Sequence, residues 1–323
     1  MTKKIKTILI TGGCGFIGSN FIRYFLAKHS NYRIINLDKL TYAGRKENLK
    51  DLAGHPRYKF IKGDVCDKKI VELLVKKSEE IIHFAAESHV DRSIEGPETF
   101  LRTNIFGTYV LLEAARKYKI KKFLFISTDE VYGSIKSGKF CETSNLAPNS
   151  PYSVSKTSAD LLCRAYFKTY GLPILITRSS NNFGPYQFPE KVIPLFITNL
   201  MRNKKVPLYG TGKNVRDWIY VLDNCTGIDF VRQHGKFGEI YNIGGGNELP
   251  NVVLTKSILK ALKKDNSWIQ PVADRLGHDW RYALDCTKIK KLGWQPKYNF
   301  EKAIDETIKW YVNNPWWWKP LIK

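Results

Sequence analysis

The fold is decided by the stretch Thr7-Ile-Leu-Ile-Thr-Gly-Gly-Cys-Gly-Phe-Ile-Gly-Ser19. A short apolar, β-branched run is followed by Gly12, Gly15 and Gly18 at three-residue spacing, and then by an apolar pattern with helical period. Glycines at this place let the backbone turn tightly, so that the first N–H groups of the helix face a pyrophosphate. The stretch therefore predicts a strand, a dinucleotide-binding turn and a helix.

Asp38 ends the next apolar run, twenty residues after Gly18. A carboxylate at this position accepts a hydrogen bond from a ribose 2′-OH and repels a 2′-phosphate, which favours NAD over NADP. The adjacent Lys39 weakens that repulsion. A glycine-rich turn followed by a helix-capping aspartate is the alternative interpretation, but the position of the glycines between a strand and a helix favours the dinucleotide site.

Short apolar runs alternate with helical patterns over the first 180 residues. The runs lie at 7–11, 33–37, 59–62, 81–85, 123–127 and 174–177, and the helical patterns lie at 15–29, 69–77, 98–118 and 152–170. This alternation predicts an α/β fold with a Rossmann-type doubly wound parallel sheet.

Glycine and proline become more closely spaced after residue 180, which predicts a smaller C-terminal lobe. We expect a first domain over 1–180 and a substrate-binding lobe over 181–217 and 246–323. A strand at 218–220, a helix at 223–233 and a strand at 240–243 are expected to rejoin the main sheet.

The chain of 323 residues carries 52 Lys and Arg against 30 Asp and Glu, a net charge of +22. Such a charge is typical of proteins that bind polyanions, and a nucleic-acid-binding or NAD-sensing regulator is one alternative. However, the lysines form scattered doublets, without a basic run of five residues. We therefore expect a solvated surface and no nucleic-acid partner.

Six cysteines stand far apart without a C-x-x-C pair, so the sequence predicts neither a metal site nor a disulfide framework and favours the reducing cytoplasm. No apolar run approaches the roughly 18 residues of a membrane span, and no secretion signal is evident. We expect no association with a membrane.

Two pairs of residues are candidates for proton transfer. Tyr152 and Lys156 open a helix at four-residue spacing, which places the phenol and the ammonium on one face, where the ammonium would stabilise a tyrosinate.

Asp129 and Glu130 follow a strand at its carboxyl end, where open α/β sheets bind ligands. Because adjacent carboxylates repel, one can be a protonated acid and the other a base, which suits elimination of water. An exposed acidic turn is the alternative.

A series of sequence blocks in this order resembles the nucleotide-sugar 4,6-dehydratases, a family of extended short-chain dehydrogenases/reductases. Besides the glycine turn, the blocks are 38–44, 63–65, 83–92, 127–133, 152–156, 181–191, 216–218, 241–245 and 274–278. The family often has proline where this chain has Leu276, so the shape of that loop stays open.

The resemblance implies an NAD-dependent lyase that dehydrates dTDP-glucose or UDP-glucose to the 4-keto-6-deoxy sugar, a step toward deoxysugars such as rhamnose. Tyr152 would remove the C4 hydroxyl proton as a hydride leaves C4 for NAD, with Thr128 hydrogen-bonding this region and Lys156 holding the nicotinamide ribose. Glu130 would then take the C5 proton while Asp129 protonates the departing C6 hydroxyl, and the hydride would return to C6.

Binding positions are also implied by the resemblance. The cofactor positions are Gly12, Gly15, Phe16, Ile17, Gly18, Asp38, Lys39, Leu40, Thr41, Asp64, Val65, Phe84, Ala85, Ala86, Glu87, Ser88, Thr103, Tyr152, Lys156 and Asn182. The sugar-nucleotide positions are Ser88, Thr128, Asn181, Lys191, Val192, Pro207, Leu208, Tyr209, Arg216, Asn251, Asp274, Arg275, Leu276, Gly277 and His278. The guanidinium groups of Arg216 and Arg275 suit a diphosphate, although either could be a surface arginine.

Three questions stay open at this point. A nucleotide-sugar 4-epimerase would share NAD, Tyr152 and Lys156 but would not use Asp129 and Glu130. The choice of thymine over uracil, and so of dTDP-glucose over UDP-glucose, depends at the base on one methyl group. The resemblance implies a homodimer joined through the helices at 98–118 and 152–170, and the aromatic segment 313–318 is expected to be a packing tail or, if exposed, a contact surface.

Overall fold

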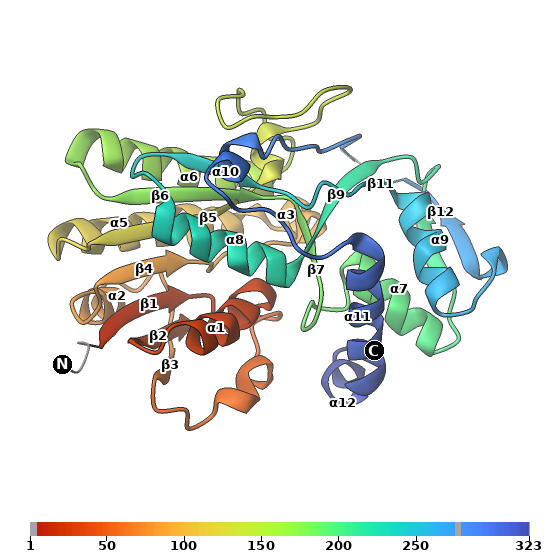
Figure 1. Ribbon diagram of the computed structural model, residues 1–323, viewed down its shortest axis with the longest axis horizontal. Coiled ribbons are helices and arrows are strands. Elements are labelled where there is room, and N and C mark those ends of the chain that lie inside the picture. The colour runs from red at the N-terminus through yellow and green to blue at the C-terminus, as the bar shows by residue number, and fades with distance from the viewer. Residues whose placement is uncertain (1–4, 275–278, 323) are drawn as a thin grey trace.

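The computed structural model describes residues 5–274 and 279–322, and its main element is a parallel sheet of seven strands in the order β10-β6-β5-β4-β1-β2-β3 (Figure 1). The strands are β1 Lys6–Thr11, β2 Tyr32–Asp38, β3 Tyr58–Lys62, β4 Glu80–His83, β5 Lys122–Thr128, β6 Ile174–Ser179 and β10 Ile240–Ile243. This order confirms the predicted Rossmann-type α/β fold.

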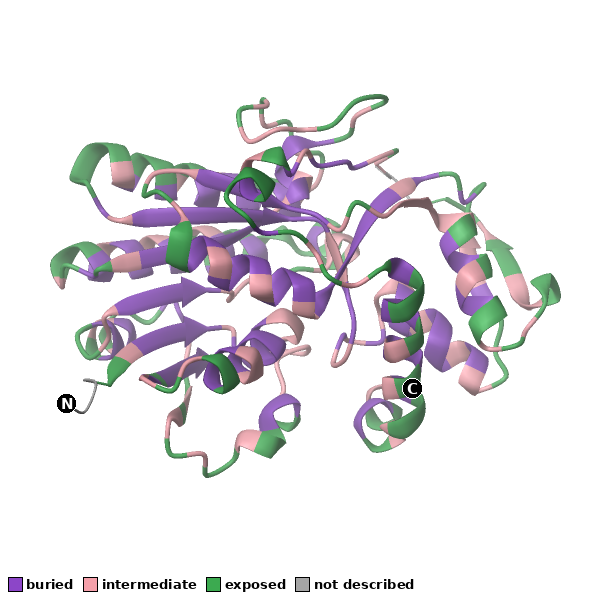
Figure 2. Ribbon diagram, viewed as in Figure 1, coloured by how far each residue is buried: buried purple, intermediate pink, exposed green. Residues whose placement is uncertain are grey.

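Helices cover both faces of the sheet because alternate strand residues are apolar on both sides. Ile8 and Ile10 of β1 pack in one buried cluster with α1 (Phe16–Lys28) and α8 (Val221–His234). Leu9 packs on the opposite face, in a cluster that includes α2 (Lys68–Val75), α5 (Gly107–Lys117) and α6 (Pro151–Tyr170). Figure 2 shows the resulting layer of buried strands between partly exposed helices.

Helix α6 carries the predicted Tyr152 and Lys156 in its first turns, and its start is specified locally. Ser150 caps the helix by accepting a hydrogen bond from the backbone N–H of Ser153, and Pro151 occupies the first turn. Gly171 ends the helix in the left-handed conformation, with φ of 66°.

The helix predicted at 98–118 is interrupted. The chain forms α4 (Pro97–Phe100), a π-helical segment η2 (Leu101–Phe106) and then α5. Asn104, within η2, accepts a hydrogen bond from the backbone N–H of Glu87 and donates to the Ser155 hydroxyl. These contacts with distant residues accompany the irregular turn, and helical periodicity does not reveal them.

The second lobe contains a three-stranded sheet of β7 (Asn181–Phe183), β9 (Val215–Tyr220) and β11 (Glu248–Pro250). The strand expected at 218–220 therefore lies in this small sheet, and its predicted return to the main sheet was wrong. The cause is the pairing of β9 with β7 and β11. By contrast, β10 pairs with β6 at the edge of the main sheet.

The remaining elements are short or belong to the second lobe. They are η1 Lys46–Leu52, α3 Val90–Glu95, η3 Asp129–Tyr132, α7 Val192–Met201, β8 Val206–Tyr209, α9 Asn251–Ala261, η4 Asn266–Trp268, β12 Ile269–Val272, α10 Thr287–Lys291, α11 Phe300–Asn313, α12 Pro315–Trp318 and η5 Lys319–Leu321. A third buried cluster joins α7, α9, α11 and α12. Within 5–274 and 279–322, no helix combines the length and the apolar character that crossing a bilayer requires.

Candidate active site

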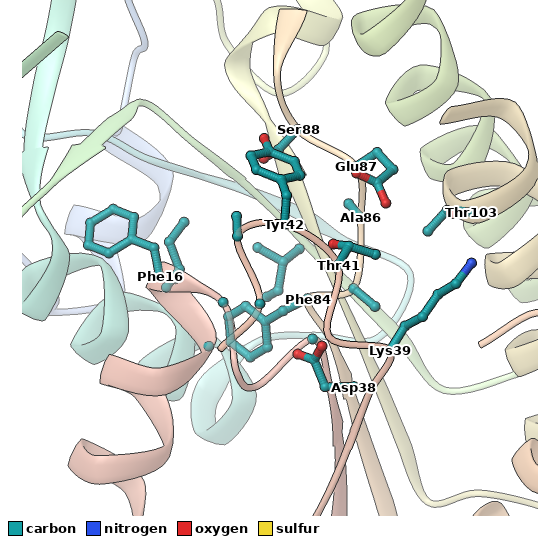
Figure 3. Close-up of a pocket in the computed structure, with 18 of the residues that line it drawn as sticks. Phe16, Asp38, Lys39, Thr41, Tyr42, Phe84, Ala86, Glu87, Ser88 and Thr103 are labelled. Atoms are coloured by element: carbon teal, nitrogen blue, oxygen red, sulfur yellow. The ribbon is translucent and has the colours of Figure 1, made fainter. Parts of the chain in front are cut away.

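A cavity lies at the carboxyl ends of β1, β2, β4 and β5, where a parallel sheet of this type binds ligands (Figure 3). The predicted cofactor residues that line it are Gly12, Gly15, Phe16, Ile17, Gly18, Asp38, Lys39, Thr41, Asp64, Val65, Phe84, Ala85, Ala86, Glu87, Ser88, Thr103, Tyr152 and Lys156. Leu40 and Asn182 are the predicted cofactor residues that are not part of this lining.

Several lining residues were missed from the sequence. Tyr42 directly follows the predicted residues of the 38–44 block, and Gln187, Phe188 and Glu190 lie within the 181–191 block. The signal that could have identified them is their position inside two sequence blocks that resemble the dehydratase family. Lys191, predicted for the sugar nucleotide, lines the same cavity and donates a hydrogen bond to the Ser88 carbonyl at 3.1 Å.

Each of the three positions in the turn requires glycine for its own physical reason. Gly12 has φ of +72°, and a Cβ there would lie 2.5 Å from the backbone nitrogen of Ala85. A Cβ at Gly18 would lie 2.4 Å from the Gly12 oxygen, so both positions exclude a side chain by packing. A Cβ at Gly15 would meet only the Gly12 oxygen, at 3.3 Å, and Gly15 lines the cavity. A side chain there would thus fill space that a pyrophosphate needs, next to the N-terminus of α1.

Asp38 is held at the end of β2 by two backbone N–H groups. Its carboxylate oxygens accept hydrogen bonds from Cys14 and Leu40, both at 2.8 Å. The ammonium of Lys39 forms an ion pair with Asp64 at 2.9 Å, so part of its charge is neutralised. A carboxylate at the cavity and a paired lysine fit the unphosphorylated ribose of NAD.

Four side chains with acid–base chemistry come together at the end of β5. We call Thr128, Asp129, Glu130 and Tyr152 the acid–tyrosine cluster. Tyr152 is buried, and its pKa is raised by burial and by the negative charges of Glu130 and Asp129, while a hydrogen bond with Thr128 lowers it. The structure therefore places the predicted phenol next to both predicted carboxyls.

Lys156 lies one helical turn after Tyr152 and is also buried. Its ammonium donates to the Ile126 carbonyl at 2.6 Å and lies 4.3 Å from the centre of the Phe125 ring. Burial lowers the pKa of Lys156 to about 8. The predicted stabilisation of a tyrosinate by Lys156 is not seen in the pKa of Tyr152, which is raised because burial outweighs the hydrogen bond with Thr128.

Asp129 has the properties of a protonated acid. The side chain is 2% exposed, and one carboxyl oxygen accepts a hydrogen bond from Thr128 at 3.2 Å. The other oxygen has no hydrogen-bond partner within the part of the chain that the structure describes. Burial and the charges of Glu130 and Asp217 raise the pKa of Asp129 well above its usual range. The shift favours the neutral carboxylic acid, which can donate a proton.

Arg216 lies close to this acid and does not line the cavity. Its guanidinium donates to the backbone carbonyls of Val215 and Asp279 and stacks over the ring of Tyr282 at 4.5 Å. Its charge lowers the pKa of Asp129. Tyr282 was missed because no motif marks it, yet the charge of Glu130 contributes to its raised pKa, which places both near one another.

The other predicted sugar-nucleotide residues occupy elements of the second lobe. Asn181 begins β7, Val192 begins α7, Asn251 begins α9, and Pro207, Leu208 and Tyr209 lie on β8. Asp274 lies beside Gly210, where its carboxyl would be 2.8 Å from an added Cβ. Arg275, Leu276, Gly277 and His278 fall outside the described residues.

His83 and His89, which flank the cavity segment 84–88, have structural contacts. His83 is buried between the hydroxyls of Thr11 and Thr108, and burial lowers its pKa to about 3, so it is neutral. His89 caps α3 through a hydrogen bond from the backbone N–H of Arg92.

Comparison with known proteins agrees with this geometry. The family model described as GDP-mannose 4,6 dehydratase matches residues 9–307. The chain belongs to this nucleotide-sugar 4,6-dehydratase family. A dTDP-glucose 4,6-dehydratase of Streptomyces antibioticus is 50% identical to this dehydratase-family chain, over 98% of the chain and 95% of the relative.

Solved structures place this dehydratase-family member more finely. DesIV, a dTDP-glucose 4,6-dehydratase of Streptomyces venezuelae solved with NAD and TYD bound, superimposes with a TM-score of 0.96 at 49% identity, covering 98% of this chain and 100% of DesIV. A UDP-glucose 4-epimerase of Thermotoga maritima has a TM-score of 0.88 at 32% identity, covering 96% and 99% of the two chains. The fold is thus shared with epimerases, whereas the sequence is nearer to the dehydratases.

Proposed function

We infer that the protein is a hydro-lyase that carries out NAD-dependent 4,6-dehydration of a nucleoside-diphosphate glucose, giving the 4-keto-6-deoxy sugar. The observation that carries this inference is the buried Asp129 at the end of β5, adjacent to Glu130 and near Tyr152, where burial and neighbouring charges raise its pKa and favour the neutral acid. Elimination of water needs a base that acts at one carbon of the sugar and an acid that acts at the hydroxyl of the next carbon. Glu130 and Asp129 provide these two groups.

The cavity supplies the residues that would hold NAD: the glycine turn at the start of α1, Asp38, and Lys156. When bound, NAD supplies a positively charged acceptor that takes a hydride from C4 and returns it to C6. For this step Tyr152 must first lose its own proton; as the phenolate it would accept the C4 hydroxyl proton, and a positive charge nearby favours the phenolate over the phenol. Thr128 orients the phenol by its hydrogen bond.

The elimination step is assigned to the two carboxyls. A ketone at C4 acidifies the C5 proton, which the Glu130 carboxylate takes. Asp129 gives its proton to the C6 hydroxyl, which leaves as water. When the hydride returns to C6, Glu130 gives its proton back to C5. Tyr152 releases the C4 hydroxyl proton to solvent and Asp129 takes one up, which its raised pKa favours.

Incubation of the purified protein with dTDP-glucose tests the function. We expect the 4-keto-6-deoxy product, identified by mass spectrometry as a loss of water. Formation of the galactose epimer alone would overturn the proposal in favour of a 4-epimerase, which is the second candidate because the fold is shared.

Glu130→Gln separates the redox step from elimination. The variant should keep NAD bound and lose exchange of the C5 proton with solvent, measured by NMR in heavy water. Exchange at the wild-type rate would remove Glu130 from its role as base.

We propose dTDP-glucose over UDP-glucose as substrate, supported by the 50% identity to a dTDP-glucose dehydratase. The two differ at the nucleotide by one base methyl and one ribose hydroxyl, and a buried methyl contributes about 1 kcal/mol. Comparing kcat/KM for the two nucleotides tests the choice; a higher value for UDP-glucose would reverse it.

We further propose a homodimer joined through η2, α5 and α6. Large apolar side chains are exposed there, including Leu101, Phe106, Val154 and Leu161. Analytical ultracentrifugation tests the dimer, and a monomer at micromolar concentration would exclude it.

We also propose a cytoplasmic setting, which is supported by six cysteines, all unpaired, five of which are buried.

A further inference from the structure

The C-terminal aromatic segment takes no part in the chemistry above, but it is tied to the cofactor side of the molecule. Trp317 is 1% exposed, whereas its neighbour Trp316 is 49% exposed. The indole N–H of Trp317 donates to the side-chain oxygen of Asn48 at 2.7 Å, a contact between α12 and η1. Asn48 is itself buried.

Asn48 is also hydrogen-bonded to the glycine turn. Its amide nitrogen donates to the Cys14 carbonyl at 2.7 Å. The backbone N–H of Arg45 donates to the same carbonyl at 3.0 Å, and the Arg45 guanidinium donates to the Trp317 carbonyl at 3.2 Å. Two routes thus lead from Trp317 to one peptide oxygen that lies between Gly13 and Gly15.

Cys14 is also held through its backbone N–H, by the carboxylate of Asp38. Its N–H donates to Asp38 at 2.8 Å, so both polar groups of this residue have fixed partners. Because the N–H and the C=O of Cys14 are both hydrogen-bonded, the two successive peptide units of the turn are held in the shape that leaves the Gly15 space open. Trp317 therefore acts on the pyrophosphate side of the cavity through Asn48.

The same aromatic segment also supports the opposite wall. The ring of Trp317 packs edge-on against Tyr186 with centroids 5.7 Å apart, and the Tyr311 hydroxyl donates to the Gln187 carbonyl. Gln187 and Phe188 line the cavity. Two buried aromatic residues of the second lobe, Tyr311 of α11 and Trp317 of α12, therefore contact the residues next to the glycine turn and next to Gln187.

We propose that Trp317 is a positioning residue for the cofactor: its indole N–H, acting through Asn48, fixes the glycine turn and slows NAD release. The inference rests on the proposed NAD-dependent function. It concerns an N–H group that never touches the cofactor or the sugar.

Trp317→Phe and Trp316→Phe form a matched pair, because both remove one indole N–H from adjacent residues. The Trp316 N–H donates to the Asn314 side chain at 3.1 Å, near the surface. NAD content is measured after denaturing each purified holoenzyme, and the release rate is followed by exchange with isotopically labelled NAD. We expect roughly tenfold faster release from Trp317→Phe, as for loss of one buried hydrogen bond, and the wild-type rate from Trp316→Phe.

A merely structural role predicts a different pattern. Positioning predicts that Trp317→Phe raises the KM for NAD and leaves kcat at saturating NAD within twofold of wild type. Equal release rates for wild type and Trp317→Phe, or equal acceleration by both variants, would overturn the proposal. A fall in the kcat of Trp317→Phe at saturating NAD as large as the rise in its KM for NAD would also overturn the proposal.

Asn48→Ala provides a second test that does not require Trp317→Phe to fold. If Trp317 acts through Asn48, the single variant Asn48→Ala releases NAD at least as fast as Trp317→Phe, and the double variant is no faster than Asn48→Ala alone. Additive effects would contradict the route. A wild-type protein that neither contains nor binds NAD would instead refute the proposed function and leave the hydrogen bonds in place.

Discussion

Two clusters of buried charged residues lie at opposite ends of the same sheet, and their hydrogen bonding differs. At the amino ends of the strands, the ionic cluster consists of Arg232, Glu80, Asp229, Tyr32 and His29. Each carboxylate oxygen of Glu80 and Asp229 accepts at least one hydrogen bond from this cluster, at 2.8–3.0 Å. At the carboxyl ends, an oxygen of Asp129 has no such partner among the described residues.

The comparison shows how one fold separates stability from chemistry. A fully hydrogen-bonded buried ion pair holds its charges in one state, and removing one partner leaves an uncompensated charge. An incompletely bonded carboxyl among other carboxyls keeps a raised pKa and is available to transfer a proton. The first cluster should therefore control unfolding and the second should control turnover.

The largest expected effect is on turnover. Asp129→Asn keeps the size of the side chain and removes the transferable proton, so kcat should fall by about 10²–10⁴-fold. Below pH 3.8, where Asp129 is neutral in both the folded and the unfolded state, the free energy of unfolding should change by less than about 1 kcal/mol, because no charge is removed. Steady-state kinetics and urea unfolding check both parts; a variant that retains wild-type kcat would contradict the role of Asp129 as acid.

Breaking the ionic cluster should have the reverse effect. Arg232→Met leaves Glu80 and Asp229 buried without their guanidinium, and the free energy of unfolding should fall by about 3–5 kcal/mol. Turnover per folded molecule should stay near the wild-type value at low temperature. Unfolding at the wild-type urea concentration would show that the cluster does not stabilise the fold.

A smaller effect should appear in the pH dependence of stability. Because the pKa of Asp129 is higher in the folded than in the unfolded state, the native protein binds more protons between the usual value of 3.8 and the raised value. Its free energy of unfolding therefore falls as pH rises through this window, by up to about 1.4 kcal/mol per pH unit from this group. Asp129→Asn should lack that contribution, so parallel pH profiles of the two proteins would contradict the raised pKa.

The smallest effect is expected for an exposed ion pair near the ionic cluster. Lys121 contacts Glu79 at 2.7 Å, but the lysine side chain is largely exposed. Lys121→Ala should change the free energy of unfolding by less than about 1 kcal/mol, as measured by urea unfolding. A loss comparable to that of Arg232→Met would mean that burial does not explain the strength of the ionic cluster.

Local sequence signals were sufficient for much of the cofactor side. The glycine spacing and Asp38 predicted the turn at the end of β1, because turn geometry depends on adjacent residues. The apolar runs likewise predicted β1 to β6. Asp129 and Glu130 could be placed at a strand end, and the predicted Tyr152 now lies next to them.

Contacts between distant segments explain what could not be predicted. The helix expected at 98–118 contains a π-helical turn where Asn104 is hydrogen-bonded to Glu87 and Ser155, residues far away in the sequence. β9 pairs inside the second lobe, which no local pattern specifies. The approach of Asp217 and Tyr282 to the acid pair depends on the folding of segments that are separated by about a hundred residues or more in the sequence.

The position of β10 has a consequence for how the chain is made. Strand β6 pairs on its outer side only with β10, and residues 180–239 lie between the two. While a ribosome is translating that interval, β6 presents unpaired backbone groups, which are a template for association with other chains. The large sheet is thus completed only after β7, α7, β8 and β9 of the second lobe have been synthesised, whereas β11, α9, α11 and α12 follow β10, so the two parts are interleaved during synthesis.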